Sequence, residues 1–262
     1  MNKVQPLKKF GQNYLQDKNI LLKIAEEINP APDDALVEIG PGLGALTNEL
    51  TQKVKLLTAI EIDTRVAEDL ENRFKNLRLI NDDFLKIDLL SLQPESPQSL
   101  RIVGNIPYNI TSPILFKLIE NNLLVEDAVF MIQYEVAKRL TALKGTKDYG
   151  ILAVILNYFA VVKFCFKVSP NVFYPKPKVF SAVVHIFFRH DRTDSKFNSL
   201  FISVVKACFG NRRKTLKNSL NNSIFRNINF DNSPVNLTLR AEQLDIPDFI
   251  SLTAYIQDCL GR

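Results

Sequence analysis

The sequence predicts an α/β protein with a mainly parallel sheet, followed by a small all-α C-terminal part. Short apolar runs alternate with amphipathic stretches over the first two thirds of the chain, and polar or glycine-rich loops follow several of these runs. The last third loses the strand-like runs and becomes helical in pattern. With 262 residues and 46% hydrophobic content, the chain can bury one large core and a smaller second one.

The expected strands are short and rich in Val, Ile and Leu, as in parallel sheets that are covered on both faces. They span residues 35–39, 56–60, 77–80, 100–103, 129–133, 161–168 and 181–188. Helices are expected between them, for example over residues 18–28, which Asp17 can cap. Further helices are expected over residues 201–209, 212–220, 240–244 and 246–260. We place the domain boundary near residue 190, with an α/β domain over 1–190 and a helical, basic domain over 191–262.

Positive charge is concentrated in one part of the chain. Between Tyr149 and Phe230 there are 13 lysines and arginines but only two acidic residues, so this stretch carries about +11 while the whole chain carries +5. Such a concentration of positive charge favours binding to a polyanion, and a nucleic acid is the first candidate partner. A solvated basic face that serves only solubility is the alternative.

The composition also predicts a cytoplasmic protein with no membrane partner. The longest nearly continuous apolar stretch, residues 151–162, has 12 residues and is too short to cross a bilayer, and the N-terminus has no apolar signal core. Three widely spaced cysteines and only two histidines argue against a disulfide framework and against a zinc site, so no metal is expected.

A glycine-rich loop, "VEIGPGLGALT", follows the first expected strand of the sheet. Gly40, Gly42 and Gly44 permit positive φ and let a ligand approach the backbone, as in Rossmann-like domains. Glu61 ends the next strand, where its carboxylate can accept hydrogen bonds from ribose hydroxyls. This spacing fits a nicotinamide dinucleotide and S-adenosylmethionine (SAM) equally well, and a purely structural turn is the alternative.

The third strand ends in "INDDF", which brings Asp82 and Asp83 to the same edge of the sheet. A carboxylate there can accept the amino hydrogens of an adenine ring. Either aspartate can instead cap the following turn, and the spacing does not choose between them. Three successive strands therefore predict an adenosine pocket at the carboxyl edge of the sheet.

The fourth strand leads into "GNIPYN", which resembles the [DN]-[PIL]-P-[YFW] motif of amino-group methyltransferases. An adenine amine is a poor nucleophile, and two acceptors on its N–H bonds would aim its lone pair at a methyl sulfonium. The carboxamide oxygen of Asn105 and a carbonyl of the Ile106–Pro107 stretch can be these acceptors, with Pro107 limiting the local backbone. Tyr108 offers a face for an extruded base. A simple Asn-Pro turn with a surface tyrosine is the alternative.

A second aromatic group is needed to enclose the base, and "NVFYPKPKVFSAVV" offers Phe173 and Tyr174 on a proline-stiffened loop. Lys176 and Lys178 would then lie beside the entering phosphates. A loop before an edge strand, with one core phenylalanine, is the structural alternative.

Five segments occur in the order seen in the small-subunit ribosomal RNA adenine dimethyltransferases of the KsgA type. These segments are "KFGQNYLQD", "VEIGPGLGALT", "GNIPYNITSP", "VFYPKPKVFSAVV" and "FGNRRKTLKNSL". The resemblance covers essentially the whole chain and implies a monomeric SAM-dependent methyltransferase that modifies N6 of two adjacent adenosines in the 3′-terminal hairpin of small-subunit rRNA. It also implies a role in small-subunit biogenesis, with the rRNA bound in the ribosomal small subunit or its precursor.

The resemblance also implies roles for individual residues. The cofactor would be bound by Asn13, Leu15, Gly40, Gly42, Glu61, Ile62, Asp83, Phe84 and Asn105. The catalytic group would comprise Asn105, Pro107, Tyr108 and Phe173. Asp83 is thereby favoured over Asp82, and Tyr14, which stands where the family often has Phe, should change little because either ring can pack there.

The "NRRKTLKNSL" segment is expected to form a helix that binds structured RNA through phosphates. On a helix Arg213 and Lys217 are four residues apart and share one stripe. The expected RNA contacts are Lys176, Lys178, Arg212, Arg213, Lys214 and Lys217. A solvated helix face is the alternative.

Other functions stay open at this point. A sister family dimethylates one adenosine in large-subunit rRNA. Its glycine loop has a sequence similar to "EIGSGKGHFT", where this chain reads "EIGPGLGALT", and it lacks the segment "FGNRRKTLKNSL". A ribosome-assembly factor whose binding matters more than its methylation is the second hypothesis. A nicotinamide oxidoreductase leaves "NIPYN" and the basic region without a role, and the long acid-free basic stretch disfavours methylation of a protein glutamine.

Overall fold

The computed structural model describes residues 5–7, 11–94, 98–211 and 213–261. The chain forms two compact units. The first unit comprises Met1–Ala137 and Val161–Arg189, and the second comprises Lys138–Ala160 and His190–Arg262. In the described part of the chain, no helix is both long and apolar enough to span a membrane.

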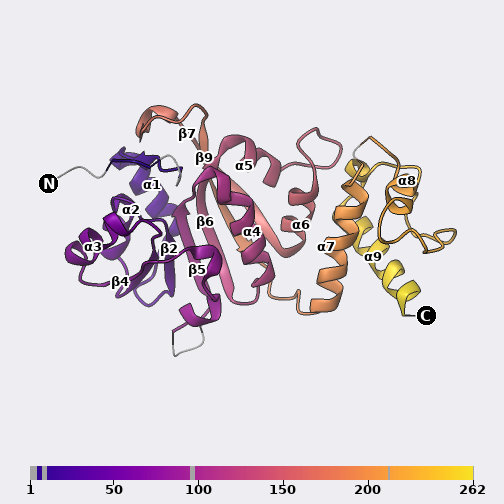
Figure 1. The fold of residues 1–262 in the computed structure, drawn as a ribbon, viewed down its shortest axis with the longest axis horizontal. Helices are drawn as coiled ribbons and strands as arrows, with labels where there is room; N and C mark the ends of the chain where they lie inside the picture. The colour runs from indigo at the N-terminus through magenta and orange to yellow at the C-terminus, as the bar shows by residue number, and fades with distance from the viewer. Residues whose placement is uncertain (1–4, 8–10, 95–97, 212, 262) are drawn as a thin grey trace. The chain divides into compact units, whose positions relative to one another are not determined.

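The first unit is built on a seven-stranded sheet in the order β4-β3-β2-β5-β6-β9-β7 (Figure 1). Its strands are β2 (Leu36–Ile39), β3 (Leu57–Ile60), β4 (Leu77–Ile80), β5 (Leu100–Asn105), β6 (Val125–Gln133), β7 (Ala160–Val168) and β9 (Ser181–Phe188). The pairs from β4 to β6 are parallel, and β9 runs antiparallel to β6. The predicted α/β class with a mainly parallel sheet is therefore confirmed.

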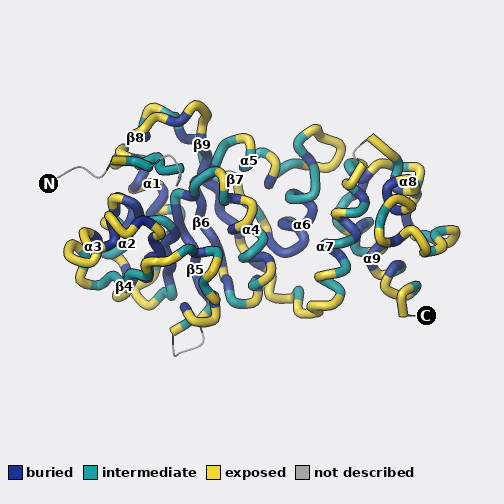
Figure 2. The backbone as a smooth tube through the Cα atoms, in the orientation of Figure 1, coloured by how far each residue is buried: buried dark blue, intermediate teal, exposed yellow. Residues whose placement is uncertain are grey.

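Helices flank this sheet and bury its strands between them (Figure 2). They are α1 (Lys18–Ile28), α2 (Ala45–Thr51), α3 (Thr64–Arg73), α4 (Thr111–Glu120) and the first residues of α5 (Tyr134–Leu140). Among these helices α1 packs beside α2 and contacts β6, α2 contacts β3, and α3 contacts β4. A two-stranded ladder joins β1 (Tyr14–Leu15) to β8 (Phe173–Tyr174).

The strand order reverses between β2 and β5. From β2 the chain moves outward through β3 and β4, then returns to place β5 on the other side of β2. The loops after β2 and β5 therefore leave the sheet side by side, at the kind of switch point where α/β proteins bind ligands.

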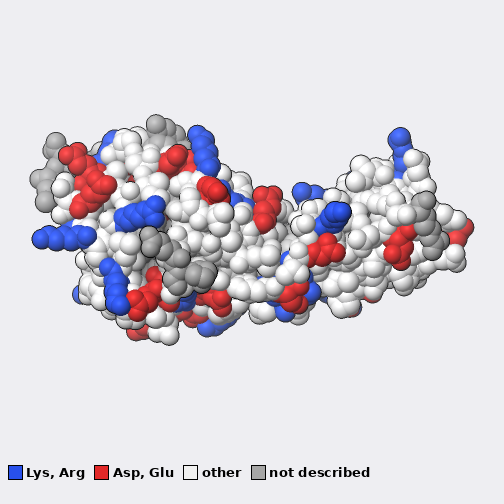
Figure 3. Space-filling view, turned by 90° about the horizontal axis from the view of Figure 1, so that it is seen from below, with Lys and Arg blue, Asp and Glu red and all other residues white. Residues whose placement is uncertain are grey.

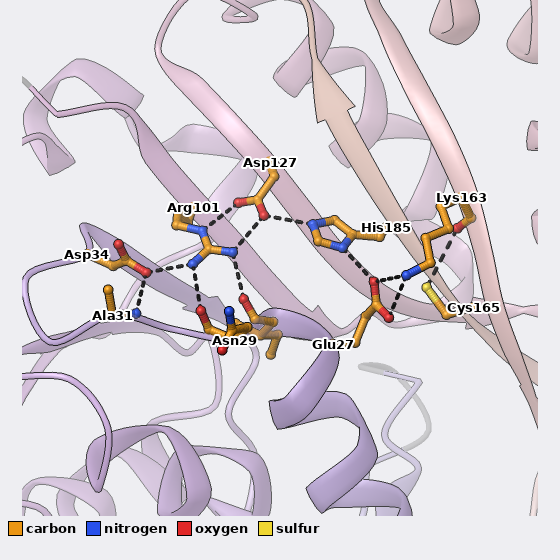
Figure 4. Close-up of polar contacts among 10 residues, drawn as sticks. Glu27, Asn29, Ala31, Asp34, Arg101, Asp127, Lys163, Cys165 and His185 are labelled. Carbon is orange, nitrogen blue, oxygen red and sulfur yellow. Dashed lines mark hydrogen bonds and ion pairs between the residues drawn. The ribbon is translucent and has the colours of Figure 1, made fainter.

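The amino ends of β5 and β6 are joined to α1 and β7 by a chain of charged side chains (Figure 4). Arg101 Nε donates to Asp127 Oδ1 at 2.9 Å, and Asp127 Oδ2 lies 2.7 Å from His185 Nε2. The other ring nitrogen of His185 lies 2.8 Å from Glu27 Oε1, which also accepts from Lys163 at 2.8 Å. This network stabilises the sheet at the edge opposite to the switch point.

The second unit is helical. It contains α6 (Ile151–Phe159), α7 (Ser195–Phe209), α8 (Leu216–Asn221), the short 3₁₀ turn η6 (Ala241–Gln243) and α9 (Ile246–Leu260). The predicted single boundary near residue 190 differs from this division, because residues 138–160 belong to the second unit. The reason is packing: Tyr158 of α6 stacks on Phe201 of α7 at a centroid distance of 4.0 Å, and Phe201 is fully buried.

Candidate active site

A cavity of about 290 Å³ opens at the carboxyl ends of β2, β3, β4 and β5. This volume is near the lower end of the range for small-molecule sites. Every residue predicted to bind the cofactor lines it: Asn13, Leu15, Gly40, Gly42, Glu61, Ile62, Asp83, Phe84 and Asn105. Pro107 and Tyr108 of the predicted catalytic group also line it.

The glycine loop bends over the end of β2 in a conformation that favours glycine. Gly40, Gly42 and Gly44 have φ values of +65°, +53° and +76°. A Cβ on Gly40 would meet nothing within 4 Å, whereas one on Gly42 would lie 2.9 Å from the ring of Tyr14. The loop therefore leaves space at Gly40 for a ligand and allows an aromatic ring to approach closely at Gly42.

Glu61 at the end of β3 holds the glycine loop in place. Its carboxylate accepts hydrogen bonds from the backbone N–H groups of Gly42 and Asp63, each at 2.9 Å. Burial raises the pKa of Glu61, and these N–H groups oppose that shift. Each carboxylate oxygen has a second lone pair, so the side chain can also accept ribose hydroxyls.

The two aspartates after β4 have different surroundings. Asp83 caps the 3₁₀ turn η2 (Phe84–Lys86) by accepting from Leu85 N at 3.0 Å, which leaves its second oxygen available. Asp82 is exposed and accepts from the N–H of Asp83 at 2.6 Å. Both line the cavity, together with the buried ring of Phe84 and the half-exposed side chain of Ile62. The capping role and the predicted adenine contact are therefore compatible in Asp83.

Asn105 is the last residue of β5, and its carboxamide has a defined orientation. Its Nδ2 donates to the backbone carbonyl of Asn13 at 2.9 Å. Because a carbonyl can only accept, the amide nitrogen must face Asn13 and Oδ1 must face away from it. The structure records no hydrogen bond from the described residues to this Oδ1.

The neighbouring residues continue this arrangement. The carbonyl of Pro107 accepts from Ile110 N at 3.1 Å, within the turn η4 (Tyr108–Ile110). The carbonyl of Ile106 receives no hydrogen bond from the described residues, while its N–H donates to Met131 O at 3.0 Å. Of the two carbonyls considered from the sequence, the one of Ile106 is therefore the available acceptor.

Tyr108 is half-buried at the cavity wall, and its hydroxyl lies 2.7 Å from Ser181 Oγ. Burial raises the pKa of this phenol, so it stays neutral at physiological pH. The contact with the first residue of β9 limits the rotation of the ring. A fixed, neutral ring is suited to stacking against a base.

Phe173 lies near the site, but its side chain does not line the cavity. It pairs with Leu15 across the β1–β8 ladder and is only 5% exposed, within an apolar cluster that includes Leu21 and Val168. The structure therefore brings Asn105, Pro107 and Tyr108 together at the cavity but buries the ring of Phe173 in the neighbouring apolar cluster. Stacking by Phe173 stays a prediction.

Two residues near the site, Gln12 and Glu38, were not singled out from the sequence, and Tyr14 was expected only to pack. Gln12 Nε2 donates to Asp63 Oδ2 at 2.9 Å, which ties the N-terminal segment to the start of α3. Tyr14 packs on the glycine loop, and its buried hydroxyl has no partner among the described residues. Glu38 lies inside β2 and accepts from Thr47 Oγ1 at 2.7 Å. Glu38 could have been noticed from the sequence, because it is a charged residue within the apolar run of residues 35–39.

The predicted RNA contacts fall in both units. Lys176 and Lys178 are exposed in the first unit, and Arg213, Lys214 and Lys217 are exposed in the second. Arg212 lies outside the described residues. Basic and acidic side chains are interspersed on the face shown in Figure 3, so this face does not carry the charge asymmetry of the sequence.

The helix predicted over residues 212–220 is wrong over residues 213–215, and Arg212 lies outside the described residues. The helix α8 begins at Leu216, and Thr215 caps it by accepting from Asn218 N at 3.5 Å. Arg213 and Lys214 therefore precede the helix, and Arg213 does not share a helical stripe with Lys217. The reason is local, because a threonine in extended geometry is a favoured helix start.

Comparisons with known proteins agree with this geometry. The family described as ribosomal RNA adenine dimethylase matches residues 4–258. A ribosomal RNA small subunit methyltransferase A from Francisella tularensis is 42% identical over 259 residues, which are 97% of this chain and 98% of the relative.

Two solved structures are also similar. A dimethyladenosine transferase from Plasmodium falciparum has a TM-score of 0.79 and 28% identity, covering 93% of this chain and 97% of that one. The 23S rRNA methyltransferase ErmE has a TM-score of 0.69 and 29% identity, covering 94% of this chain and 100% of that one. The family match extends over nearly the whole chain, and the protein therefore belongs to the ribosomal RNA adenine dimethylase family.

Proposed function

We propose that this protein transfers methyl groups from SAM to N6 of two adjacent adenosines in the 3′-terminal hairpin of small-subunit rRNA, two methyls to each. The observation that carries the proposal is the carboxamide of Asn105, which the Asn13 carbonyl orients with its oxygen free at the cavity wall. The 42% identity to a small-subunit enzyme favours this substrate over the large-subunit one.

The described residues fit SAM as the cofactor. Asp83 has an oxygen available for an adenine amine, Glu61 has lone pairs for ribose hydroxyls, and Gly40 leaves space beside the loop. Tyr14 also lines the cavity, and its buried hydroxyl has no partner among the described residues. When bound there, SAM supplies a methyl group activated by its sulfonium.

The chain itself positions the acceptor amine. Oδ1 of Asn105 and the carbonyl of Ile106 accept the two N–H bonds of the adenine amine, and Tyr108 stacks on the extruded ring. In the transfer the new N–C bond would form as the methyl C–S bond of the sulfonium breaks, which would leave a neutral thioether, and the amine proton, made acidic by alkylation, would pass to solvent. No general base is required for this transfer.

Substitutions at Asn105 test the proposal. Asn105→Ala removes one acceptor and the contact to Asn13, and the methylation rate should fall about 10²- to 10³-fold. Asn105→Asp should also be impaired, because a carboxylate would face the Asn13 carbonyl at about the present 2.9 Å with no proton to share. Asn109→Ala, at an exposed position of the same motif, is the matched control.

The measurement is incubation with tritiated SAM and unmethylated small subunits, followed by nucleoside analysis. Dimethyladenosine should be the end product under excess SAM, and a wild-type product that stops at monomethyladenosine would contradict the proposal. Methylation by Asn105→Ala at the wild-type rate would remove this side chain from the mechanism.

A role in ribosome assembly is the second candidate function. It is favoured by the exposed cations Arg213, Lys214 and Lys217 of the second unit, which we propose as its RNA-binding residues. The substrate would be the cytoplasmic small subunit or its precursor, bound by a monomer. Substituting Arg213 and Lys217 should weaken subunit binding and reduce its salt dependence, while Asn105→Ala should leave binding intact.

A further inference from the structure

A group of aromatic side chains and one lysine lies beside the candidate active site and has no role in the chemistry described above. We call it the aromatic–lysine patch and define it as Tyr134, Phe164, Lys167 and Phe180. All four residues belong to the first unit. Phe164 and Phe180 are 39% and 45% exposed, and Lys167 is exposed.

The patch is built by segments that meet at the carboxyl end of β6. Tyr134 follows directly after this strand, and its N–H donates to Phe180 O at 3.0 Å. The rings of Tyr134 and Phe164 contact edge to face at 6.1 Å. The ammonium of Lys167 lies 3.8 Å from the ring centroid of Phe180 and 4.5 Å from that of Tyr134.

Its connection to the candidate active site is direct. Phe180 immediately precedes Ser181, whose hydroxyl lies 2.7 Å from the hydroxyl of Tyr108. Tyr134 lies three residues after Met131, which is paired with Asn105 across β5 and β6. The backbone segments that carry the patch therefore adjoin residues that contact Tyr108 and Asn105.

Its charge is positive. Among the described residues, Lys167 forms no ion pair with a carboxylate, and its ammonium faces aromatic rings instead. Exposed Lys176 and Lys178 lie in the segment that leads to Phe180, again without a carboxylate partner in the described ranges. Flat exposed rings with unpaired cations are the combination that binds single-stranded nucleic acid.

We propose that the aromatic–lysine patch binds a nucleotide that flanks the target adenosine, with its base stacked on Phe180 and its phosphate beside Lys167. The proposal rests on the proposed RNA substrate. An adenosine that is extruded into the cavity leaves its neighbours with an uncovered face, and an aromatic surface beside the cavity can cover that face. The aromatic–lysine patch would thus bind the RNA strand next to the target adenosine while the adenine base occupies the cavity.

Three variants separate stacking from charge. Phe180→Ala removes the ring, whereas Phe180→Tyr keeps it. Lys167→Met removes the charge and keeps much of the side-chain length. Leu56→Ala is the control, because Leu56 is also an exposed apolar residue (53%) of the first unit but lies before β3, at the opposite edge of the sheet.

The first assay measures methylation of unmethylated small subunits. Phe180→Ala should raise KM for the subunit about tenfold with unchanged affinity for SAM, and Phe180→Tyr should behave like wild type. Lys167→Met should lower the slope of log KM against log salt by about one. A KM for Phe180→Ala within twofold of both wild type and Leu56→Ala would overturn the proposal.

The second assay needs no catalysis. A hairpin RNA carries 2-aminopurine next to the target position, and stacking on a ring lowers its emission. The emission in complex should be lower with wild type than with Phe180→Ala, and equal emission would refute stacking. A defect seen with whole subunits but not with the hairpin would assign the patch to a protein contact instead. If the emission is lower with wild type than with Phe180→Ala but wild type does not methylate small subunits, the proposed methylation substrate is wrong, while the proposed nucleotide binding by the aromatic–lysine patch is still supported.

Discussion

The buried carboxyl group of Glu38 should make the free energy of unfolding depend on pH, and the substitution Glu38→Gln measures this contribution separately from those of other groups. Glu38 is 2% exposed inside β2, beneath the glycine loop, and burial raises its pKa from an ordinary 4.5 to about 7. This shift of about 2.5 units corresponds to about 3 kcal/mol at 1.36 kcal/mol per unit. Glu38→Gln replaces the carboxyl by a group that does not ionise and can still accept from Thr47.

The direction follows from the raised pKa. The folded protein retains a proton on Glu38 that the unfolded chain loses above pH 4.5. The stabilising contribution is therefore complete below pH 4.5 and is lost as pH rises through about 7. The free energy of unfolding of wild type minus that of Glu38→Gln should fall by about 3 kcal/mol over this range.

Urea unfolding at several pH values between 4 and 8 measures this difference. Groups that do not interact with Glu38 titrate alike in both proteins, so their contributions cancel in the difference, whereas the charge of Glu61 is part of the effect that is measured. Glu26→Gln, at an exposed position on α1, serves as the control for replacing a glutamate by glutamine. A difference for Glu38→Gln that changes by less than about 1 kcal/mol would show that burial does not hold the proton there.

Three further predictions concern the site and the sheet. Asp83→Asn retains the capping oxygen but presents N–H groups to the adenine amine. Calorimetry should therefore show about tenfold weaker SAM binding, with no decrease in Tm. An unchanged affinity for SAM would exclude the adenine contact. Gly42→Ala should lower Tm more than Gly145→Ala. Both glycines have positive φ, +53° and +80°, but the new Cβ at position 42 would lie 2.9 Å from the Tyr14 ring, whereas the one at position 145 would meet open space. Equal decreases in Tm would show that the contact with the Tyr14 ring has no effect on stability. Burial alone would raise the pKa of Asp127, but the hydrogen bonds and charges of Arg101 and His185 together lower it. Its contribution to stability therefore exists above its unfolded pKa and is lost as pH falls. Asp127→Asn should flatten this acid loss in unfolding titrations, and an unchanged acid limb would contradict the assignment.

The strands and their carboxyl edge could be predicted because local patterns determine them. The apolar run over 181–188 became β9 with the same bounds, and Asp17 caps α1 through Ile20 N at 3.1 Å. Side chains that directly follow parallel strands must meet at one edge of the sheet. For this reason the positions of Glu61 and Asp83 at the cavity followed from the sequence.

The partners of these side chains depended on contacts between distant segments. Asn105 is oriented by the carbonyl of Asn13, 92 residues away, and no periodicity encodes that pairing. The ring of Phe173 was expected at the site, but its position opposite Leu15 on β1 turns it into the apolar core. Residues 138–160 similarly joined the second unit through the packing of α6 on α7.

The sequence alone thus determined the strands of the seven-stranded sheet and the residues that follow them, because backbone geometry and hydrophobic period act over a few residues. Only the tertiary structure decided which carbonyl orients Asn105, which aromatic ring stays accessible and where the two units divide. Those outcomes depend on burial and hydrogen bonding between segments that are far apart in the chain, which local patterns do not specify.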